Sequence, residues 1–224
     1  MTNNKRQVKT ISTSTKIGRG TKIGFHTVIG FPKIKNKHVQ IGQNCSIGNQ
    51  VTICTDVRLG KKVIVGDHSF ISCGAVIQNE VFVDTHTFVG DNVVIGEHSL
   101  VLYGARIYDN VQIGENARIA GFVAENTFIG NYVSMFGSII HPYRNPKHWN
   151  GGEKSPIIED FVVIGFNSTI VGNVKIGHHV YIAAGSIVSK DVPSYSMVVG
   201  VNKVTPFKNW NGKMKKSDFW RWNK

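Results

Sequence analysis

Of the nine histidines in this 224-residue chain, His141 has the position that best suits catalysis. Counting in steps of six from Val123 through Ile129 and Met135 leads to His141, so an imidazole takes a place that is otherwise aliphatic, and Pro142 follows it. Imidazole titrates near neutral pH and can take a proton from an alcohol or amine that attacks a carbonyl carbon. We therefore predict that His141 is a general base; the alternative is a loop-opening histidine without chemistry.

Other histidines occupy a shared position that favours turns. Five of them come three residues after an aliphatic residue, where polar corner residues face water: His26, His68, His86, His98 and His179. The three cysteines, Cys45, Cys54 and Cys73, have no metal or redox spacing. These positions predict corner residues and packing rather than a metal site.

An aliphatic residue at every sixth position is the main structural signal. A period of six does not match the 3.6-residue repeat of a helix, but it matches a short strand followed by a turn, with one side chain pointing inward. Stacked units of this kind form a solenoid with a dry interior. The pattern is interrupted by "FPKIKNKH" at 31–38, slips in phase after residue 119, and is lost over about 141–156. Its uninterrupted part is Ile41, Ile47, Ile53, Leu59, Val65, Ile71, Ile77, Val83, Val89, Ile95, Val101, Ile107, Ile113 and Ile119.

The units "KIGRGT", "SIGNQV", "VIGEHS", "QIGENA" and "KIGHHV" resemble the repeat of the hexapeptide acyltransferases, over about residues 11–204. The resemblance implies an all-β fold, a left-handed parallel β-helix with three hexapeptides per coil. It also implies a homotrimer in which acyl-CoA lies between adjacent prisms. We expect a β-helix domain at 1–204 with an excursion loop at about 141–156, and a basic, Trp-rich segment at 205–224 with a short helix that caps the last coil.

The segment 162–200 resembles the C-terminal block of this family, which contacts the cofactor. By this resemblance, Gly165, Phe166 and Ala184 line the pantetheine channel, and the two lysines, Lys190 and Lys203, lie near the phosphates. The alternatives are that the small residues keep the coil tight and that Lys190 is a solvated turn residue. The residues so predicted are Gly165, Phe166, Ala184, Ser189, Lys190 and Lys203.

Four further residues are candidates for binding the acceptor. Glu125 and Asn126 lie where the phase slips and have side chains that bond to sugar hydroxyls. Tyr143 and Trp149 lie in the excursion loop and offer flat faces to a sugar ring or a nucleotide base. The alternatives are an ordinary polar corner and aromatic side chains that hold the loop in place.

Composition limits the function classes. The net charge of +12 favours a polyanionic ligand such as CoA or a nucleotide-sugar, unless it is an ordinary basic surface. No apolar run reaches the length of a membrane span, and the first residues do not resemble a signal peptide. We expect a cytoplasmic protein with no metal and no nucleic-acid partner.

These patterns predict an acyltransferase that takes acetyl-CoA or another acyl-CoA as co-substrate. The expected acceptor is an amino-sugar, nucleotide-linked, or a sugar hydroxyl, and transfer is direct. Three alternatives stay open: a xenobiotic or antibiotic O-acetyltransferase, a noncatalytic trimeric scaffold, and a zinc hydratase of the same fold. The γ-class carbonic anhydrases, which share that fold, would require two histidines five positions apart, and this sequence has no such pair.

Overall fold

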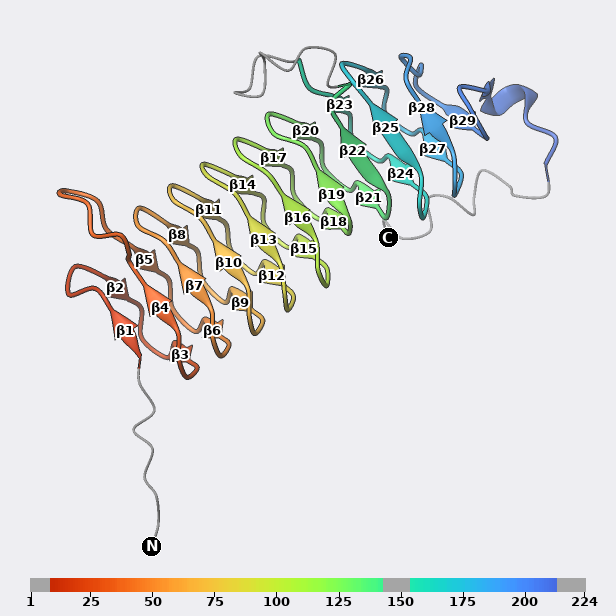
Figure 1. Ribbon diagram of the computed structural model, residues 1–224. Coiled ribbons are helices and arrows are strands. Elements are labelled where there is room, and N and C mark those ends of the chain that lie inside the picture. Colours follow the sequence, from red (N-terminus) through yellow and green to blue (C-terminus); the bar gives the residue numbers. More distant parts are fainter. Residues whose placement is uncertain (1–8, 143–153, 213–224) are drawn as a thin grey trace, which may run out of the picture.

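The computed structural model describes residues 9–142 and 154–212, which form a three-sided solenoid of short parallel strands (Figure 1). Each strand pairs with the strand one coil before and one coil after it. Ile71, for example, lies beside Ile53 in one direction and Val89 in the other. The predicted all-β parallel β-helix of hexapeptide repeats is confirmed, and its left-handed sense stays a prediction.

The strands form three sheets, one on each side of the solenoid. The first sheet contains β1 (Thr10–Ile11), β4 (Val28–Ile29), β7 (Thr52–Ile53), β10 (Phe70–Ile71), β13 (Phe88–Val89), β16 (Arg106–Ile107), β19 (Phe122–Val123), β22 (Ser138–Ile140), β25 (Thr169–Val171) and β28 (Ile187–Val188). The second contains β2 (Lys16–Ile17), β5 (Gln40–Ile41), β8 (Arg58–Leu59), β11 (Val76–Ile77), β14 (Val94–Ile95), β17 (Gln112–Ile113), β20 (Phe128–Ile129), β23 (Ile157–Ile158) and β26 (Lys175–Ile176). The third contains β3 (Lys22–Ile23), β6 (Ser46–Ile47), β9 (Ile64–Val65), β12 (Phe82–Val83), β15 (Leu100–Val101), β18 (Arg118–Ile119), β21 (Ser134–Met135), β24 (Val163–Ile164), β27 (Tyr181–Ile182), β29 (Ser196–Val198) and β30 (Val204–Pro206).

The aliphatic residues of the six-residue pattern fill the interior. All fourteen of the uninterrupted series are buried, and Ile53, Ile71 and Ile95 have no exposed surface. Stacking each of them on its counterpart in the next coil removes its apolar surface from water, which is the main favourable term for such a fold. The core is therefore one continuous column along the solenoid axis.

Each coil turns sharply at three corners, and most corners contain a residue in the left-handed backbone region. The predicted corner histidines all lie there, with φ between 55° and 59°. Non-glycine residues adopt this region at a cost, and Asn, Asp and His are enriched in it. His68 and His86 stack with their ring centroids 4.8 Å apart. The prediction that these histidines are turn residues is confirmed.

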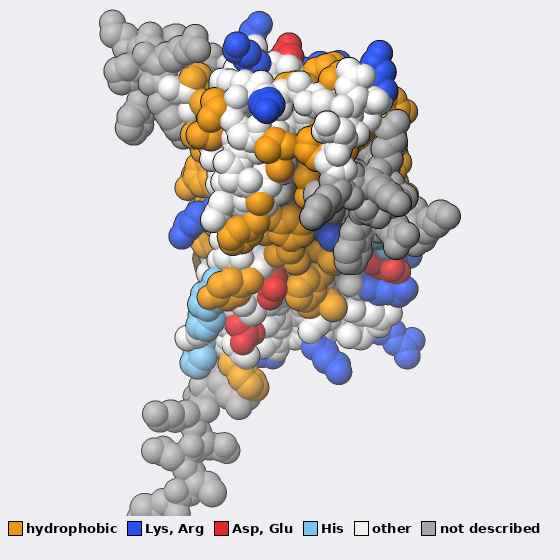
Figure 2. All heavy atoms as spheres, turned by 90° about the vertical axis from the view of Figure 1, so that its right-hand side faces the viewer, with side chains coloured by type: hydrophobic (Ala, Val, Ile, Leu, Met, Phe, Trp, Pro, Cys, Tyr) orange, Lys and Arg blue, Asp and Glu red, His pale blue; other side chains and the backbone are white. Residues whose placement is uncertain are grey.

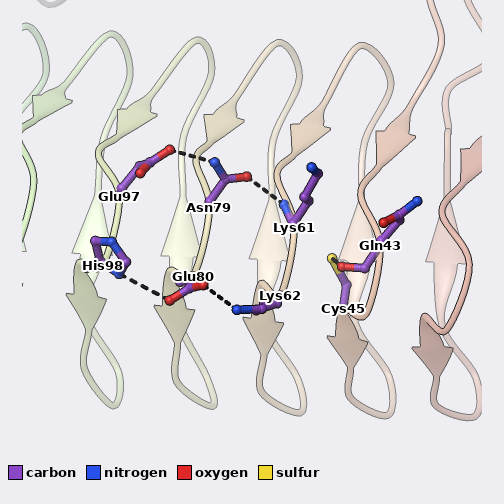
Figure 3. A network of polar contacts seen from close by, with 8 residues as sticks. All are labelled: Gln43, Cys45, Lys61, Lys62, Asn79, Glu80, Glu97 and His98. Atoms are coloured by element: carbon purple, nitrogen blue, oxygen red, sulfur yellow. Dashed lines mark hydrogen bonds and ion pairs between the residues drawn. The ribbon is translucent and has the colours of Figure 1, made fainter.

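Polar side chains at the corners between the second and third sheets connect successive coils (Figure 3). Lys62 Nζ lies 2.6 Å from Glu80 Oε1, and His98 Nδ1 lies 3.4 Å from Glu80 Oε2. The hydrogen bond and charge of Lys62 lower the pKa of Glu80. In the parallel ladder, the Asn79 amide donates to Glu97 Oε1 over 2.5 Å. Because these contacts are exposed, we expect them to favour the correct register of the coils while adding little to the free energy of unfolding.

Two consecutive coils are two residues shorter than the others, at the same corner. Val123 follows Ile119, and Ile139 follows Met135, after only four residues instead of six, yet both are buried in register. The phase slip expected after Ile119 is confirmed. The second slip corrects the position expected for His141: Ile139 takes the inward place, and His141 lies two residues beyond it, just after β22 ends.

The last described residues extend the third sheet and turn back. β30 pairs antiparallel with β29, and η2 (Phe207–Asn209) follows as a single 3-10 turn. Phe207 is buried against Met197, with Tyr181 and Trp210 packed beside them. Residues 213–224 of the predicted capping segment lie outside the described residues, so the domain boundary at 204/205 stays a prediction.

The short corners generate a test of what keeps the coils in register. A Cβ on residue 121 would collide with the backbone carbonyl of Gly137, and φ at Gly121 is +98°. Gly121→Ala should therefore lower the free energy of unfolding by about 2–4 kcal/mol, measured by chemical denaturation. Gly104 is the matched control, since its φ is +66° but a Cβ there meets nothing within 4 Å. Gly104→Ala should cost only the left-handed strain, about 1–2 kcal/mol; equal losses for both would contradict this account.

Candidate active site

The excursion loop leaves the solenoid at the corners that join the first sheet to the second, called here the His141 edge. β22 ends at Ile140 and β23 begins at Ile157, which confirms the predicted interruption at about 141–156. Residues 143–153 lie outside the described residues, and so do two predicted acceptor-binding residues, Tyr143 and Trp149. The remaining parts of the site are described below.

The structure brings His141 and Glu125 together. They lie on adjacent coils of the His141 edge, directly after β22 and β19, and His141 Nε2 is 3.5 Å from Glu125 Oε2. The side chain of His141 is only 2% exposed, whereas that of Glu125 is 26% exposed. A carboxylate beside an imidazole orients the ring and stabilises its protonated form. The structure therefore brings two predicted site residues together, and the role of His141 as a base stays a prediction.

Neighbouring residues hold the pair in place. Ser155 Oγ, at the returning end of the loop, donates a hydrogen bond of 2.6 Å to the carbonyl oxygen of Glu125. Pro142 lies against Gly172 on the next coil, where a Cβ would come within 3.6 Å of the proline ring. Ser155 could not be predicted from the sequence, because nothing in the residues around Ser155 indicates a contact with a residue 30 positions earlier.

Asn126, predicted to bind the acceptor, belongs to a ladder of corner amides. Asn110 Nδ2 donates to Asn126 Oδ1 over 3.2 Å, and Asn92 bonds in the same way to Asn110 over 3.3 Å. Asn126 also has a left-handed backbone, with φ of 57°. These features support the alternative reading of a polar corner, and an acceptor contact by Asn126 stays a prediction.

Three of the predicted cofactor residues gather at a different edge, where the third sheet joins the first. A Cβ on Gly165 would lie 2.5 Å from the backbone nitrogen of Ala184, so glycine permits the close approach of these two coils. Phe166 is 67% exposed and accepts a hydrogen bond from Gly185 N at its carbonyl oxygen. Figure 2 shows hydrophobic side chains gathered over the C-terminal end of the solenoid, where Val201 is also exposed.

Ser189 and Lys190 lie on the His141 edge, directly after β28, whereas Lys203 lies in the hairpin between β29 and β30, where its carbonyl oxygen accepts from Val199 N. Asn202 connects them, because its side chain accepts from Ser189 N over 2.8 Å and donates to Ser189 Oγ over 2.9 Å. Lys190 and Lys203, the neighbours of these two residues, are exposed. Lys190 lies two coils beyond His141, roughly 10 Å along the axis at about 4.8 Å per strand spacing.

One chain thus places Phe166 and His141 at opposite edges of the first sheet. β25 and its flanking residues separate the two edges, a span of roughly 17 Å for five residues of extended chain. The apolar patch around Phe166 and the imidazole are therefore distinct in a single chain, while Lys190 shares the edge of the imidazole.

A hollow of about 300 Å³, lined in part by His178 and His179, lies between the second and third sheets. Its histidines contact each other, with 3.0 Å between the Nδ1 atoms of His178 and His179, and burial lowers the pKa of His179. Glu159 Oε1 lies 2.7 Å from Lys175 Nζ, and its Oε2 accepts from His178 N over 2.8 Å. Because these groups satisfy one another, this hollow resembles a structural cluster more than a reaction site.

Two further observations concern metals and membranes. In residues 9–142 and 154–212, no group of three or more His, Cys, Asp or Glu side chains is arranged to hold a metal ion. Among the same residues, no helix is long and apolar enough to cross a membrane.

Comparison with known proteins identifies the repeat. The bacterial transferase hexapeptide (six repeats) family matches residues 38–73 and 155–190. Serine acetyltransferase 4 of Arabidopsis thaliana is 40% identical over 78 residues, which is 35% of this chain and 21% of that protein. The bifunctional protein GlmU of Thermotoga petrophila is 29% identical over 136 residues, 49% of this chain and 31% of that protein.

Solved structures with similar folds include two acyltransferases. The UDP-N-acetylglucosamine acyltransferase of Francisella novicida is 21% identical, with a TM-score of 0.42, over 88% of this chain and 69% of that one. Serine acetyltransferase of Neisseria gonorrhoeae is 26% identical, with a TM-score of 0.33, over 54% of this chain and 38% of that one. The matches span only 21 to 31% of the length of the curated relatives.

Proposed function

We propose that this chain, which is a hexapeptide-repeat protein of the bacterial transferase type, is an acyltransferase that moves an acyl group from CoA to a small acceptor. The observation that supports this most directly is the pairing of His141 with Glu125 beside the excursion loop, at 3.5 Å. The names of the curated relatives, which include serine acetyltransferases, support the same class of reaction.

His141 acts as the general base in this proposal. Because Nε2 is the ring nitrogen near Glu125 Oε2, at 3.5 Å, the proposal assigns Nδ1 to take the proton from the attacking hydroxyl or amine of the acceptor. Glu125 stabilises the imidazolium that forms, and the proton then passes to the departing thiolate. The acceptor oxygen or nitrogen bonds to the acyl carbon as the carbon–sulfur bond breaks, giving an ester or amide and free thiol.

The burial of His141 has a consequence for this step. Because 2% of its side chain is exposed, bulk water is kept from the imidazole, and an acceptor must displace the groups that cover it. Backbone N–H groups at the edge can stabilise the oxyanion of the tetrahedral intermediate. Direct transfer needs no covalent acyl-enzyme, so no cysteine takes part.

The acyl donor is proposed to be acetyl-CoA or another acyl-CoA. Phe166 and Ala184 offer an apolar surface for pantetheine, and Lys190 and Lys203 offer charge for the phosphates. Lys190 lies near His141 along one edge, whereas Phe166 lies at the other edge of the first sheet. A trimer would bring the Phe166 edge of one copy to the His141 edge of another.

The proposed acceptor is an amino-sugar, free or nucleotide-linked, or a sugar hydroxyl, in a cytoplasmic setting. A small hydroxyl amino acid is a second candidate, which the serine acetyltransferase similarity favours. A screen of thiol release from acetyl-CoA against amino-sugars, nucleotide-linked amino-sugars, L-serine and an antibiotic alcohol tests both. The absence of CoA binding by calorimetry would favour a noncatalytic scaffold instead.

The base role of His141 predicts a large loss of turnover on substitution. His141→Ala and His141→Asn should each lower kcat by about 10²–10⁴, because neither side chain can accept the proton. CoA binding should change little, and the wild-type rate should fall towards acidic pH. His86→Asn is the matched control, since His86 is a corner residue away from the site. If His141→Ala keeps more than a third of the activity in a folded protein, the base role is wrong.

The two possible roles of Glu125 predict different kinetics. If Glu125 is the partner of His141, Glu125→Gln should lower kcat about tenfold or more with little change in KM, because the amide stabilises an imidazolium less well. A residue that only binds the acceptor would instead raise KM and leave kcat nearly unchanged. Steady-state kinetics with the acceptor found in the screen distinguish these outcomes.

The cofactor assignment predicts weaker binding without Lys190. Lys190→Ala should reduce the free energy of CoA binding by roughly 1–2 kcal/mol, the scale of a charge-assisted hydrogen bond. The loss should be smaller for CoA that lacks its 3′-phosphate, if that group is the partner. Calorimetry with Lys208→Ala as a control measures the difference; unchanged affinity would move the phosphate site, with Lys203 the next candidate.

Assembly is the fourth expectation from this proposal. The first sheet presents apolar side chains outward, with Phe70 and Phe88 stacked at 5.7 Å, and Phe82 lies on the third. A threefold assembly would cover part of this surface. Light scattering should give about three times the 24.8 kDa of one chain. A monomeric mass at micromolar concentration would count against a site shared between copies.

A further inference from the structure

The N-terminal end of the chain is rich in positive charge and has no acidic residue. Nine of the 26 Lys and Arg residues, and none of the 14 Asp and Glu residues, precede Asp56, so three quarters of the net charge of +12 arises in the first 55 residues. Seven of the nine lie in the described residues, on the first coil and in the 31–38 loop, with Lys16, Arg19 and Lys22 on the first coil. This distribution creates a local positive potential around the N-terminal coils.

The same end exposes apolar side chains. Ile17 occupies an inward position but is 42% exposed, whereas the equivalent residues of the middle coils are buried. Phe25, at a corner of the first coil, is 41% exposed, and Lys9 Nζ lies 5.8 Å from the centre of its ring. The N-terminal cross-section of the described solenoid is therefore an apolar centre with a basic rim.

The interruption at 31–38 adds a projecting loop to this end. It leaves the corner after β4, and every residue of it is exposed (Figure 1). Apolar and basic side chains alternate along it: Phe31 is 39% exposed, Ile34 is 42% exposed, and Lys33 and Lys35 flank Ile34. Among the described residues, Lys33 and Lys35 have no ion-pair partner.

The base of this loop is fixed to the solenoid while its apolar residues project. Lys37 Nζ lies 3.1 Å from Asp56 Oδ2, and Lys37 N donates to the Ile34 carbonyl over 3.2 Å. Thr55 Oγ1 also donates to the Lys37 carbonyl, over 3.5 Å. Phe31 and Ile34 are thus exposed on a loop that polar contacts of Lys37 fix to the solenoid.

We propose that the N-terminal end of the solenoid, formed by the first coil and the 31–38 loop, docks on the surface of an anionic lipid bilayer. Lys33 and Lys35 would lie among the lipid headgroups, attracted by their negative charge, while Phe31 and Ile34 enter the boundary with the acyl chains. Nucleic acid would also attract the lysines, but it gives no burial to an aliphatic side chain such as Ile34 or Ile17. The observations therefore favour a membrane.

This docking leaves the candidate active site clear of the membrane. β22, which His141 directly follows, lies six coils beyond β4 in the first sheet. At about 4.8 Å per coil, the imidazole stands roughly 30 Å from the 31–38 loop along the axis. The enzyme would be held at the bilayer with its reaction site exposed to the aqueous phase, whatever its acceptor.

Vesicle flotation with the full chain tests the proposal. The chain should float with vesicles of phosphatidylcholine that contain 30% phosphatidylglycerol, should not float with pure phosphatidylcholine, and should be released as salt rises. Phe31→Ser with Ile34→Ser, and separately Lys33→Glu with Lys35→Glu, should each lower the bound fraction at least about fivefold. Circular dichroism checks that each variant is folded.

Matched controls carry the same chemical changes elsewhere. Ile64→Ser with Phe128→Ser removes exposed apolar side chains from the sheets, and Arg106→Glu with Lys208→Glu reverses two exposed charges; both should bind vesicles like the wild type. Equal losses in controls and loop variants, or no flotation of the wild type, would overturn the proposal. Retention of a DNA duplex that depends on Lys33 and Lys35, without vesicle binding, would reassign the surface to nucleic acid.

Discussion

The structure depends on one repeated contact: the inward aliphatic side chain of a short strand packs on its counterpart in the next coil. Backbone hydrogen bonds of 2.8–3.0 Å hold those two strands at the spacing that this packing needs. Because each strand is only two or three residues long, no strand has a core of its own, and stability comes from stacking neighbours. A change in the length of a corner is tolerated provided that the inward residues stay in register.

That tolerance explains where function is possible. The corner after β18 and the corner after β21 each lose two residues, yet Val123 and Ile139 remain in the column. Sixteen residues, 141–156, separate β22 from β23, and Ile158 still packs under Ile176. The repeat specifies the core, while the corners are free to carry Glu125 and His141 on adjacent coils without disturbing it.

The two ends of the solenoid differ in chemistry, which a repeat alone would not produce. The N-terminal end is basic with exposed Ile17 and Phe25, whereas the C-terminal end exposes Phe166 and Val201 and closes with an antiparallel strand. A solenoid leaves its terminal coils with only one neighbour each. Those coils therefore expose a cross-section of the solenoid, whereas the middle coils expose only their sheet faces and corners.

The sequence by itself determined the class of fold, the inward residues and the corner histidines, because a period of six with one aliphatic residue per unit fits only a stack of short strands and turns. It also located the loop at 141–156 and selected His141 and Glu125 as chemically interesting. It could not place them together: it put His141 in the aliphatic column, which Ile139 occupies, and it gave Glu125 a separate role. Only the tertiary structure decided that these side chains meet, that Ser155 closes on Glu125, and that Phe166 lies at the opposite edge. The reason is that contacts across coils depend on the exact number of residues in each turn, and two residues fewer at one corner move every later side chain without altering the local pattern.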